Sequence, residues 1–128
     1  AILMLLWGRA EKFYPVANSK KRYENRKYLE YVAQKPCCLT KAGVYSHSHG
    51  VQVHHLLKPW SGVRGMGLRA GDQNSIPLCF HHHQMLHTKF GSEAKFFKSF
   101  GLPEDFGQQE AKRLWEEYND EVDTDLPF

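Results

Sequence analysis

The stretch that decides the fold is Cys79-Phe-His-His-His83-Gln-Met-Leu-His87. Its two numbered histidines are four residues apart, so on a helix they share one face and can hold one transition metal. Upstream, the pair His54 and His55 lies in Val-Gln-Val-His-His-Leu, whose alternation predicts a strand. Because neighbouring strand residues point to opposite faces, one histidine of this pair can bind a metal while the other remains free as a general base.

These histidines, together with an asparagine between them, resemble the HNH, or ββα-metal, nucleases. The resemblance is strongest in Asn74-Ser-Ile-Pro-Leu-Cys-Phe-His-His-His83-Gln-Met-Leu-His87 and covers about residues 37–101. The steps of nine residues from Asn74 to His83 and of four to His87 are similar to those of colicin-type DNases. The succession of the motifs His-His-Leu, Arg-Gly-Met-Gly and Ile-Pro-Leu-Cys is similar to that in small phage and prophage HNH proteins, among them recombination nucleases that act with RecA.

The resemblance implies an α+β fold, with a small ββα-metal core and flanking N- and C-terminal helices. It implies a metal-dependent endonuclease that hydrolyses DNA with low sequence specificity, since no recognition element such as a helix-turn-helix is apparent in the sequence. By the motif, His55 is the general base and Asn74 orients it through a hydrogen bond. The implied metal ligands are His54, His83 and His87. The metal is divalent, with Zn, Mn, Ni and Mg left open.

DNA is the implied partner, and the phage relatives suggest a RecA-type filament as a second one. Two other functions remain open on the sequence. A non-catalytic, zinc-stabilised nucleic-acid-binding module would keep His83 and His87 as structural ligands and would leave His55 without a role. A metal hydrolase that acts on RNA or on smaller phosphoesters would use the same donors.

A second set of possible ligands consists of Cys37, Cys38, Cys79 and His82. Many HNH proteins carry a structural zinc on two Cys-x-x-Cys pairs, but here Thr40 stands where one of these cysteines would be. Either His47 or His49 completes the set as a fourth ligand, or the site is lost and the cysteines are simply buried. The second interpretation is favoured, because free cysteine is among the most frequently buried residues.

The segment from Leu57 to Asp72 is a glycine-rich loop with basic residues. Arg64 and Arg69 are candidate DNA contacts, because glycine allows a close approach and arginine binds phosphate with a planar fork. Lys58 is a further candidate for a DNA contact. The alternative to DNA binding by the loop arginines is an ion pair between one of them and Asp72. Asp72 itself can bind the metal, bond to a ligand histidine or cap a turn, and turn capping is favoured.

At 128 residues the chain has room for one domain, divided here into segments 1–36, 37–101 and 102–128. A net charge of +3 permits a nucleic-acid partner without requiring one. The apolar start, residues 1–7, is too short for a membrane span, so we expect a buried strand or helix start there. Three cysteines, two of them adjacent, favour a reducing cytoplasm over a disulfide framework. The resemblance to phage proteins implies that this is the cytoplasm of a bacterial or phage-infected cell.

The remaining elements follow from periodicity and from the positions of glycine and proline. The sequence predicts a helix over 17–33, strands over 43–45 and 51–56 joined by a turn, an extended piece over 75–78, and helices over 92–100 and 103–118. Ser92 is the predicted cap of the helix over 92–100, and Leu114, Trp115 and Tyr118 are predicted to pack inward from the last helix. The acidic tail over 119–125 is expected to be loose.

Overall fold

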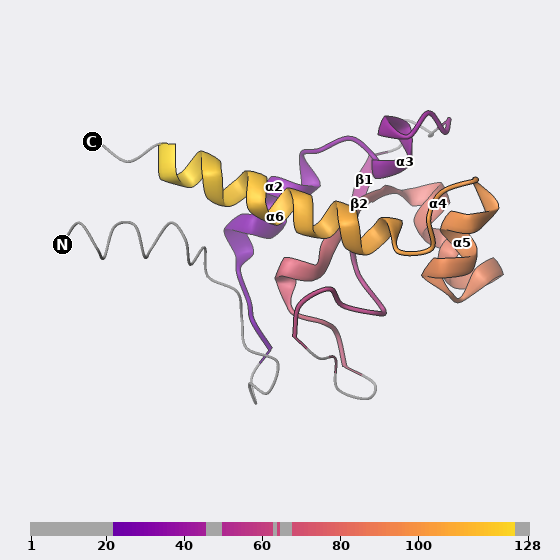
Figure 1. Cartoon of the computed structure of the whole chain (residues 1–128), viewed down its shortest axis with the longest axis horizontal. Coiled ribbons are helices and arrows are strands. Elements are labelled where there is room, and N and C mark those ends of the chain that lie inside the picture. Colours follow the sequence, from indigo (N-terminus) through magenta and orange to yellow (C-terminus); the bar gives the residue numbers. More distant parts are fainter. Residues whose placement is uncertain (1–21, 46–49, 63, 65–67, 125–128) are drawn as a thin grey trace.

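The computed structural model describes residues 22–45, 50–62, 64 and 68–124 of the chain. Over these residues the predicted α+β class is confirmed, with one two-stranded antiparallel sheet surrounded by helices (Figure 1). In chain order the elements are α2 (Arg26–Ala33), α3 (Cys38–Lys41), β1 (Val51–His55), η1 (Asp72–Asn74), β2 (Ser75–Cys79), α4 (Phe80–Met85), η2 (Leu86–Phe90), α5 (Glu93–Ser99) and α6 (Phe106–Thr124). Element η1 is a 3-10 helix, and η2 is a π-helical turn that follows α4 directly. The prediction for residues 1–7 lies outside the described residues.

The sheet pairs β1 with β2, so that His54 lies opposite Ile76. The predicted hairpin between residues 43–45 and β1 is wrong, because residues 43–45 form no strand, and most of its turn, residues 46–49, lies outside the described part. Burial explains the choice of partner: every residue of β2 is buried, whereas Tyr45 is 78% exposed. A strand of buried residues offers β1 cross-strand packing that an exposed segment does not.

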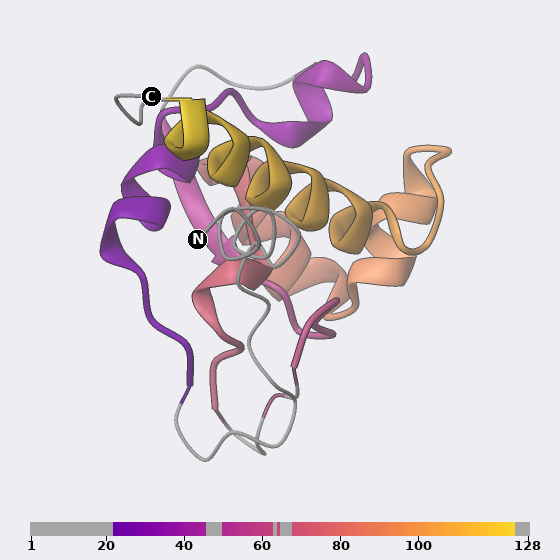
Figure 2. The ribbon, with the colours of Figure 1, turned by 60° about the vertical axis from the view of Figure 1, so that its left-hand side comes forward.

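Different helices cover the two faces of the sheet, with α2 and α6 on one face and α4 on the other (Figure 1 and Figure 2). Val53 packs toward α2 and α6, in the cluster that holds Tyr28 and Trp115. His54, the next residue, points the other way and reaches His83 of α4. The alternation of β1 therefore sends successive side chains into different layers.

Helix α2 begins later than the predicted helix over 17–33, of which residues 17–21 lie outside the described part. Asn25 is its N-cap, and its side-chain oxygen accepts a hydrogen bond from a backbone N–H of the first turn. Ahead of this cap the chain is not helical, and the N–H of Asp72 donates to the carbonyl of Tyr23 at 2.9 Å. The segment that precedes α2 is thus attached to η1 rather than wound into the helix.

Helix α6 begins after the start of the predicted helix over 103–118 and includes most of the tail over 119–125, which was expected to be loose. The prediction that Trp115 packs inward is confirmed, since this side chain is buried. Contacts with α2 support this part of the helix, because the Tyr31 hydroxyl donates to the carboxylate of Glu117 at 2.5 Å and lies 3.4 Å from that of Glu121. Asp120 and Glu121 therefore lie on a helix that packs against the core.

Helix α5 has the predicted cap, because the hydroxyl of Ser92 accepts the N–H of Lys95 at 3.4 Å. The helix ends before the predicted break at Gly101, which has a positive φ of 78°. None of the helices in the described ranges combines the length and the apolar character that a membrane crossing needs.

Candidate metal centre

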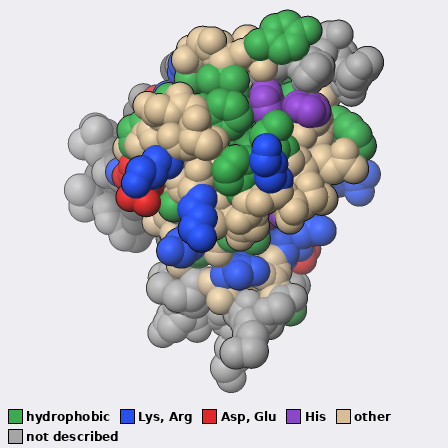
Figure 3. Space-filling view, turned by 90° about the vertical axis from the view of Figure 1, so that its right-hand side faces the viewer, with side chains coloured by type: hydrophobic (Ala, Val, Ile, Leu, Met, Phe, Trp, Pro, Cys, Tyr) green, Lys and Arg blue, Asp and Glu red, His purple; other side chains and the backbone are tan. Residues whose placement is uncertain are grey.

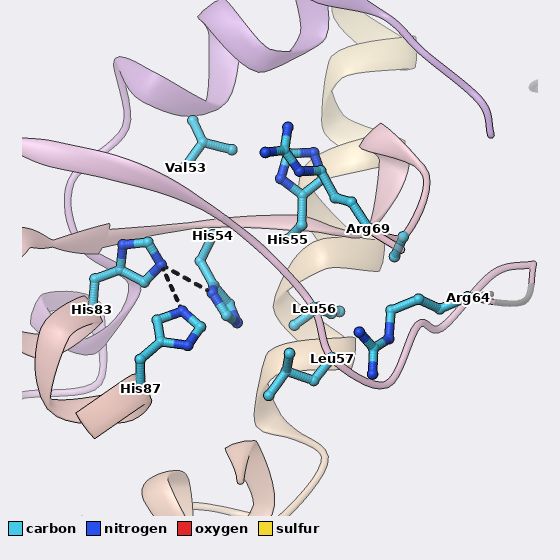
Figure 4. Close-up of a pocket in the computed structure, with 10 residues that line it drawn as sticks. Val53, His54, His55, Leu56, Leu57, Arg64, Arg69, His83 and His87 are labelled. Atoms are coloured by element: carbon cyan, nitrogen blue, oxygen red, sulfur yellow. Dashed lines mark hydrogen bonds between the residues drawn. The ribbon is translucent and has the colours of Figure 1, made fainter. Parts of the chain in front are cut away.

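Three histidine rings from three elements converge beside the end of β1, and we call them the histidine triad (Figure 4). His54 comes from β1, His83 from α4 and His87 from η2. Nδ1 of His54 lies 3.2 Å from Nε2 of His83, which lies 3.1 Å from Nε2 of His87. The structure therefore brings the three predicted ligands together, with one nitrogen of each ring within 4.8 Å of the others.

The local sequence explains how α4 and η2 present two rings of the triad on one face. The sulfur of Cys79 caps α4 by accepting the N–H of His82. The π-helical turn η2 then continues the helix as far as Gly91, whose φ of 67° ends it in the left-handed region. Across this join the rings of His83 and His87 remain neighbours, with centroids 4.8 Å apart.

Partners outside the triad indicate which nitrogen carries the proton in the neutral forms of two of its rings, His54 and His83. Nε2 of His54 lies 2.6 Å from the carboxylate of Glu93, which can only accept, so the lone pair of this ring is on Nδ1. Nδ1 of His83 lies 2.7 Å from Oε1 of Gln52, which leaves the lone pair of His83 on Nε2. Two lone pairs thus face each other across 3.2 Å without a proton to share. Nitrogen donors about 2.0–2.1 Å from a tetrahedral zinc are roughly 3.3 Å apart, so this spacing suits a bound cation.

The surroundings also disfavour the protonated forms of two rings of the triad, His83 and His87. Burial, reinforced by the neighbouring His54 and His87, lowers the pKa of His83 to about 4. Burial, again with a contribution from His54, lowers the pKa of His87. Because transition metals bind neutral imidazole, little proton competition opposes metal binding at these two rings near pH 7.

The low pKa of His83 predicts a pH dependence for the stability of the metal-free protein. An unfolded His83 takes up its proton near pH 6.5, whereas the folded one takes it up only near pH 4. The unfolded state binds more protons between these values, so the free energy of unfolding should fall as the pH is lowered from 6.5 to about 4. Urea denaturation across this range measures the effect, and metal-free His83→Gln should lose less stability than wild type. Equal losses in the two proteins would contradict the prediction.

Glu93 is a candidate functional residue that the sequence pattern did not reveal. It is 4% exposed at the start of α5, and its Oε2 accepts hydrogen bonds from Nε2 of His54 and from the N–H of Leu57, the latter at 2.7 Å. Its Oε1 accepts the N–H of Lys58 at 3.2 Å. A carboxylate in this position orients a ligand histidine and raises its basicity. The local sequence gives no signal for this role, because the partner histidine lies on β1, far back in the chain.

His55 points away from the triad and still lines the same cavity (Figure 4). Its Nε2 lies 2.8 Å from Oδ1 of Asp72 in η1. The cavity has a volume of about 290 Å³, and its lining also includes the triad, Arg64 and Arg69. One histidine of the adjacent pair therefore joins the triad, while its neighbour stays outside it within the same cavity, as the strand alternation predicts.

Asn74 does not form the predicted hydrogen bond with His55, and this expectation is corrected. Its Oδ1 accepts the N–H groups of Trp60 and Ser61, and its Nδ2 donates to the carbonyl of Ser61. The residue is fully buried, and these bonds commit its amide group to the loop that follows β1. Asn74 therefore shapes the loop, and Asp72 occupies the position beside the His55 ring.

Asp72 neither joins the triad nor forms a hydrogen bond with one of its rings. Its carboxylate instead accepts hydrogen bonds from residues outside η1. It accepts hydrogen bonds from His55 and from Arg22, the latter at 2.7 Å. The arginine that pairs with Asp72 is therefore Arg22, and not a loop arginine as in the alternative considered from the sequence. Burial raises the pKa of the Asp72 carboxyl, but bonds from His55, the Asn25 N–H and Arg22 outweigh it and leave the pKa below its ordinary value.

The basic candidates lie at and near the cavity. Arg64 and Arg69 are exposed and line it, and the guanidinium of Arg64 donates to the Leu68 carbonyl at 3.2 Å. Lys58 is exposed, and its carbonyl accepts a hydrogen bond from the side chain of Gln108. In Figure 3, lysine and arginine side chains are spread over the face that α4 and α5 help to form, and acidic side chains are sparse there. Contact of these residues with DNA stays a prediction.

The second predicted set is partly assembled. Cys37, Cys79 and His82 are buried, and one donor atom of each lies within 4.8 Å of the others. Sγ of Cys79 lies 3.2 Å from Nδ1 of His82. Cys38 lines a separate, smaller cavity, and the proposed fourth ligands 47 and 49 lie outside the described residues. The cysteines are free and buried, as predicted, but two sulfurs and an imidazole gathered this closely are also a zinc-type donor set.

Comparisons with known proteins give a family but no activity. A family model described as a protein of unknown function, DUF968, matches residues 12–106. The chain is 32% identical over 88 residues to "Uncharacterized protein YdfU" of Escherichia coli (strain K12), an alignment that covers 63% of this chain. The same alignment covers 23% of the relative, so the chain spans about a quarter of that protein's length. No solved structure matches the chain.

Proposed function

The chain belongs to the DUF968 family, whose function is unknown, and we propose that it is a divalent-metal-dependent endonuclease of the HNH type that hydrolyses DNA phosphodiester bonds. The observation that carries the proposal is the convergence of one ring nitrogen each of His54, His83 and His87 beside a separately held His55. Three ligands leave coordination positions for water and phosphate, as a catalytic metal site requires. A purely structural metal site would have no use for the fourth histidine in the cavity.

The residues of the cavity have separate roles in the proposed hydrolysis. A bound divalent metal supplies Lewis-acid chemistry, which neutralises phosphate charge and stabilises the leaving oxygen. His55 takes the proton from the attacking water. Arg64 and Arg69 bind phosphate oxygens with their guanidinium forks. Imidazole donors suit Zn, Ni or Mn better than Mg, which prefers oxygen ligands.

The proposed substrate is a DNA chain rather than a small phosphoester. Arg64 and Arg69 line the cavity, and lysine and arginine side chains spread over the face that α4 and α5 help to form (Figure 3). Both observations favour a long polyanion, whose binding weakens steeply as salt rises. A RecA-type filament is the first protein partner to test, on the strength of the resemblance to phage recombination nucleases alone.

Plasmid cleavage tests the proposal. Wild type should nick supercoiled DNA with at least one of Mn²⁺, Ni²⁺, Zn²⁺ and Mg²⁺, and His55→Ala should lower the rate by roughly 100-fold or more while it still binds metal. His81→Ala is the matched control, because His81 is an exposed histidine of α4 that lies outside the triad. Wild type without cleavage of single- or double-stranded DNA, with every metal and with an added RecA filament, would reject the nuclease in favour of a non-catalytic binding module. Full activity in His55→Ala would reject His55 as the base.

A further inference from the structure

The segment before α2 is tied to the proposed general base through one carboxylate, that of Asp72. Oδ1 of Asp72 lies 2.8 Å from Nε2 of His55 and accepts a hydrogen bond from Nη1 of Arg22 at 2.7 Å. Oδ2 accepts the backbone N–H of Asn25 at 2.8 Å. The backbone N–H of Asp72 in turn donates to the carbonyl of Tyr23 at 2.9 Å. Residues from the N-terminal part of the chain therefore hold both oxygens of this carboxylate in place.

This arrangement fixes the Asp72 side chain as a charged acceptor. The side chain is 5% exposed, and donors reach it from His55 of β1 and from the segment before α2. Its carboxyl pKa lies below the ordinary value for the reasons given above, so the group is ionised at neutral pH. A fixed carboxylate that can only accept hydrogen bonds decides which nitrogen of a bonded imidazole keeps its proton.

For His55 the consequence is a single tautomer. The proton sits on Nε2, facing Asp72, and the lone pair sits on Nδ1. Among the described residues no hydrogen bond engages Nδ1, and the ring lines the cavity that also holds the triad. Nδ1 is therefore the atom that can accept a proton from water.

We propose that Asp72 is the positioning residue of the general base: it holds His55 as the Nε2–H tautomer, with Nδ1 available in the cavity, and it is itself held by Arg22 and the N–H of Asn25. The inference rests on the proposed nuclease function. In the reaction, one O–H bond of water breaks, its proton goes to Nδ1 of His55, and the oxygen forms a bond to phosphorus. The P–O3′ bond then breaks, the 3′ oxygen takes a proton from solvent, and His55 returns its proton to solvent. Asp72 balances the positive ring without touching the DNA.

The competing explanation is that Asp72 only attaches the N-terminal segment to η1. A structural tie of this kind would affect stability and would leave the catalytic rate of the folded protein unchanged. The two explanations therefore differ in kcat and in the protonation pattern of His55.

Asp72→Asn separates them, because a carboxamide has one acceptor oxygen and cannot serve His55, Arg22 and the Asn25 N–H together. In plasmid nicking by the metal-loaded protein, we expect kcat to fall by roughly 100-fold, as for loss of a general base's orienting partner. KM for DNA and the metal affinity should stay within about threefold of wild type. Asp105→Asn, a change of the same kind at an exposed position, is the matched control. If Asp72→Asn does not fold, Arg22→Gln takes its place, with an expected loss in kcat of roughly tenfold.

A spectroscopic measurement covers the case in which rates cannot be compared. Nitrogen-15 NMR of the histidine side chains, with and without Zn²⁺, should show His55 as the Nε2–H tautomer in wild type and as a tautomer mixture in Asp72→Asn. Assignment uses the signal that disappears in His55→Ala. A wild-type Nδ1–H tautomer, or a folded Asp72→Asn with kcat within about threefold of wild type, would overturn the inference. Complete absence of cleavage by wild type would instead reject the proposed function. The NMR measurement would then still show whether Asp72 fixes the tautomer of His55.

Discussion

Replacing His83 with alanine is expected to remove metal binding at the histidine triad and to lower DNA cleavage by roughly 1000-fold or more. His83 is the central member, because its Nε2 lies 3.2 Å from Nδ1 of His54 and 3.1 Å from Nε2 of His87. Without it, two donors remain from separate elements, and a pair of imidazoles does not hold a catalytic metal in a fixed geometry. The loss should exceed that in His55→Ala, which leaves the metal in place.

Two measurements together check this prediction. Calorimetric titration with Zn²⁺ or Ni²⁺ should show one fewer site in His83→Ala than in wild type, and plasmid nicking should fall to background. His81→Ala serves again as the control, since it removes an exposed imidazole without touching the triad. Unchanged metal binding by His83→Ala would mean that the triad is not the metal site, and retained cleavage would separate the proposed activity from the triad.

Two local rules made part of the triad predictable, and the resemblance to the HNH nucleases supplied the choice of His54 over His55 as its third member. A spacing of four residues places His83 and His87 on one helical face, and the continuation of α4 into η2 preserves that arrangement. Strand alternation separates His54 from His55 whichever strand β1 pairs with. Each rule acts over a few residues, so the sequence was sufficient for both.

The partners of these histidines could not be predicted, because they depend on contacts between distant segments. The sequence contains many acids, and only packing brings Glu93 to His54 and Asp72 to His55. The pairing of β1 was also missed, since the stretch before Gly50 is closer in sequence but too exposed to compete with the buried β2. Asn74 was assigned to the wrong partner, because a buried carboxamide bonds to whichever backbone groups lie nearest, and those belong to the loop after β1.

The start of α2 illustrates the same limit on a smaller scale. Ala17 and the basic residues from Lys20 onward have good helix propensity, and propensity alone places the start of the helix there. The helix starts after Asn25 instead, because the Asn25 side chain caps the first turn and the preceding residues form hydrogen bonds with η1. That shift is what brings Arg22 to Asp72 and makes the N-terminal part of the chain relevant to the cavity.

Replacing Glu93 with alanine is expected to weaken metal binding at the triad by roughly 10- to 100-fold and to destabilise the metal-free protein by about 2–4 kcal/mol. The carboxylate is almost completely buried, and it accepts hydrogen bonds from Nε2 of His54 and from the N–H groups of Leu57 and Lys58. Alanine leaves these donors without partners and frees the His54 ring to rotate away from its ligand geometry. Chemical denaturation of the metal-free protein measures the loss of stability, and competition with a metal indicator measures the affinity.

Glu93→Gln distinguishes the two roles of this residue. The carboxamide oxygen that this substitution introduces can still accept one of the hydrogen bonds, so the variant should be more stable than Glu93→Ala. Its NH₂ group, however, faces other donors, and the negative charge that raises the basicity of His54 is gone. The metal affinity should therefore recover less than the stability does. Glu104→Ala, at an exposed position, is the control and should change neither quantity. A Glu93→Ala protein that binds metal as tightly as wild type would show that His54 needs no carboxylate to act as a ligand, and that Glu93 serves the loop after β1 alone.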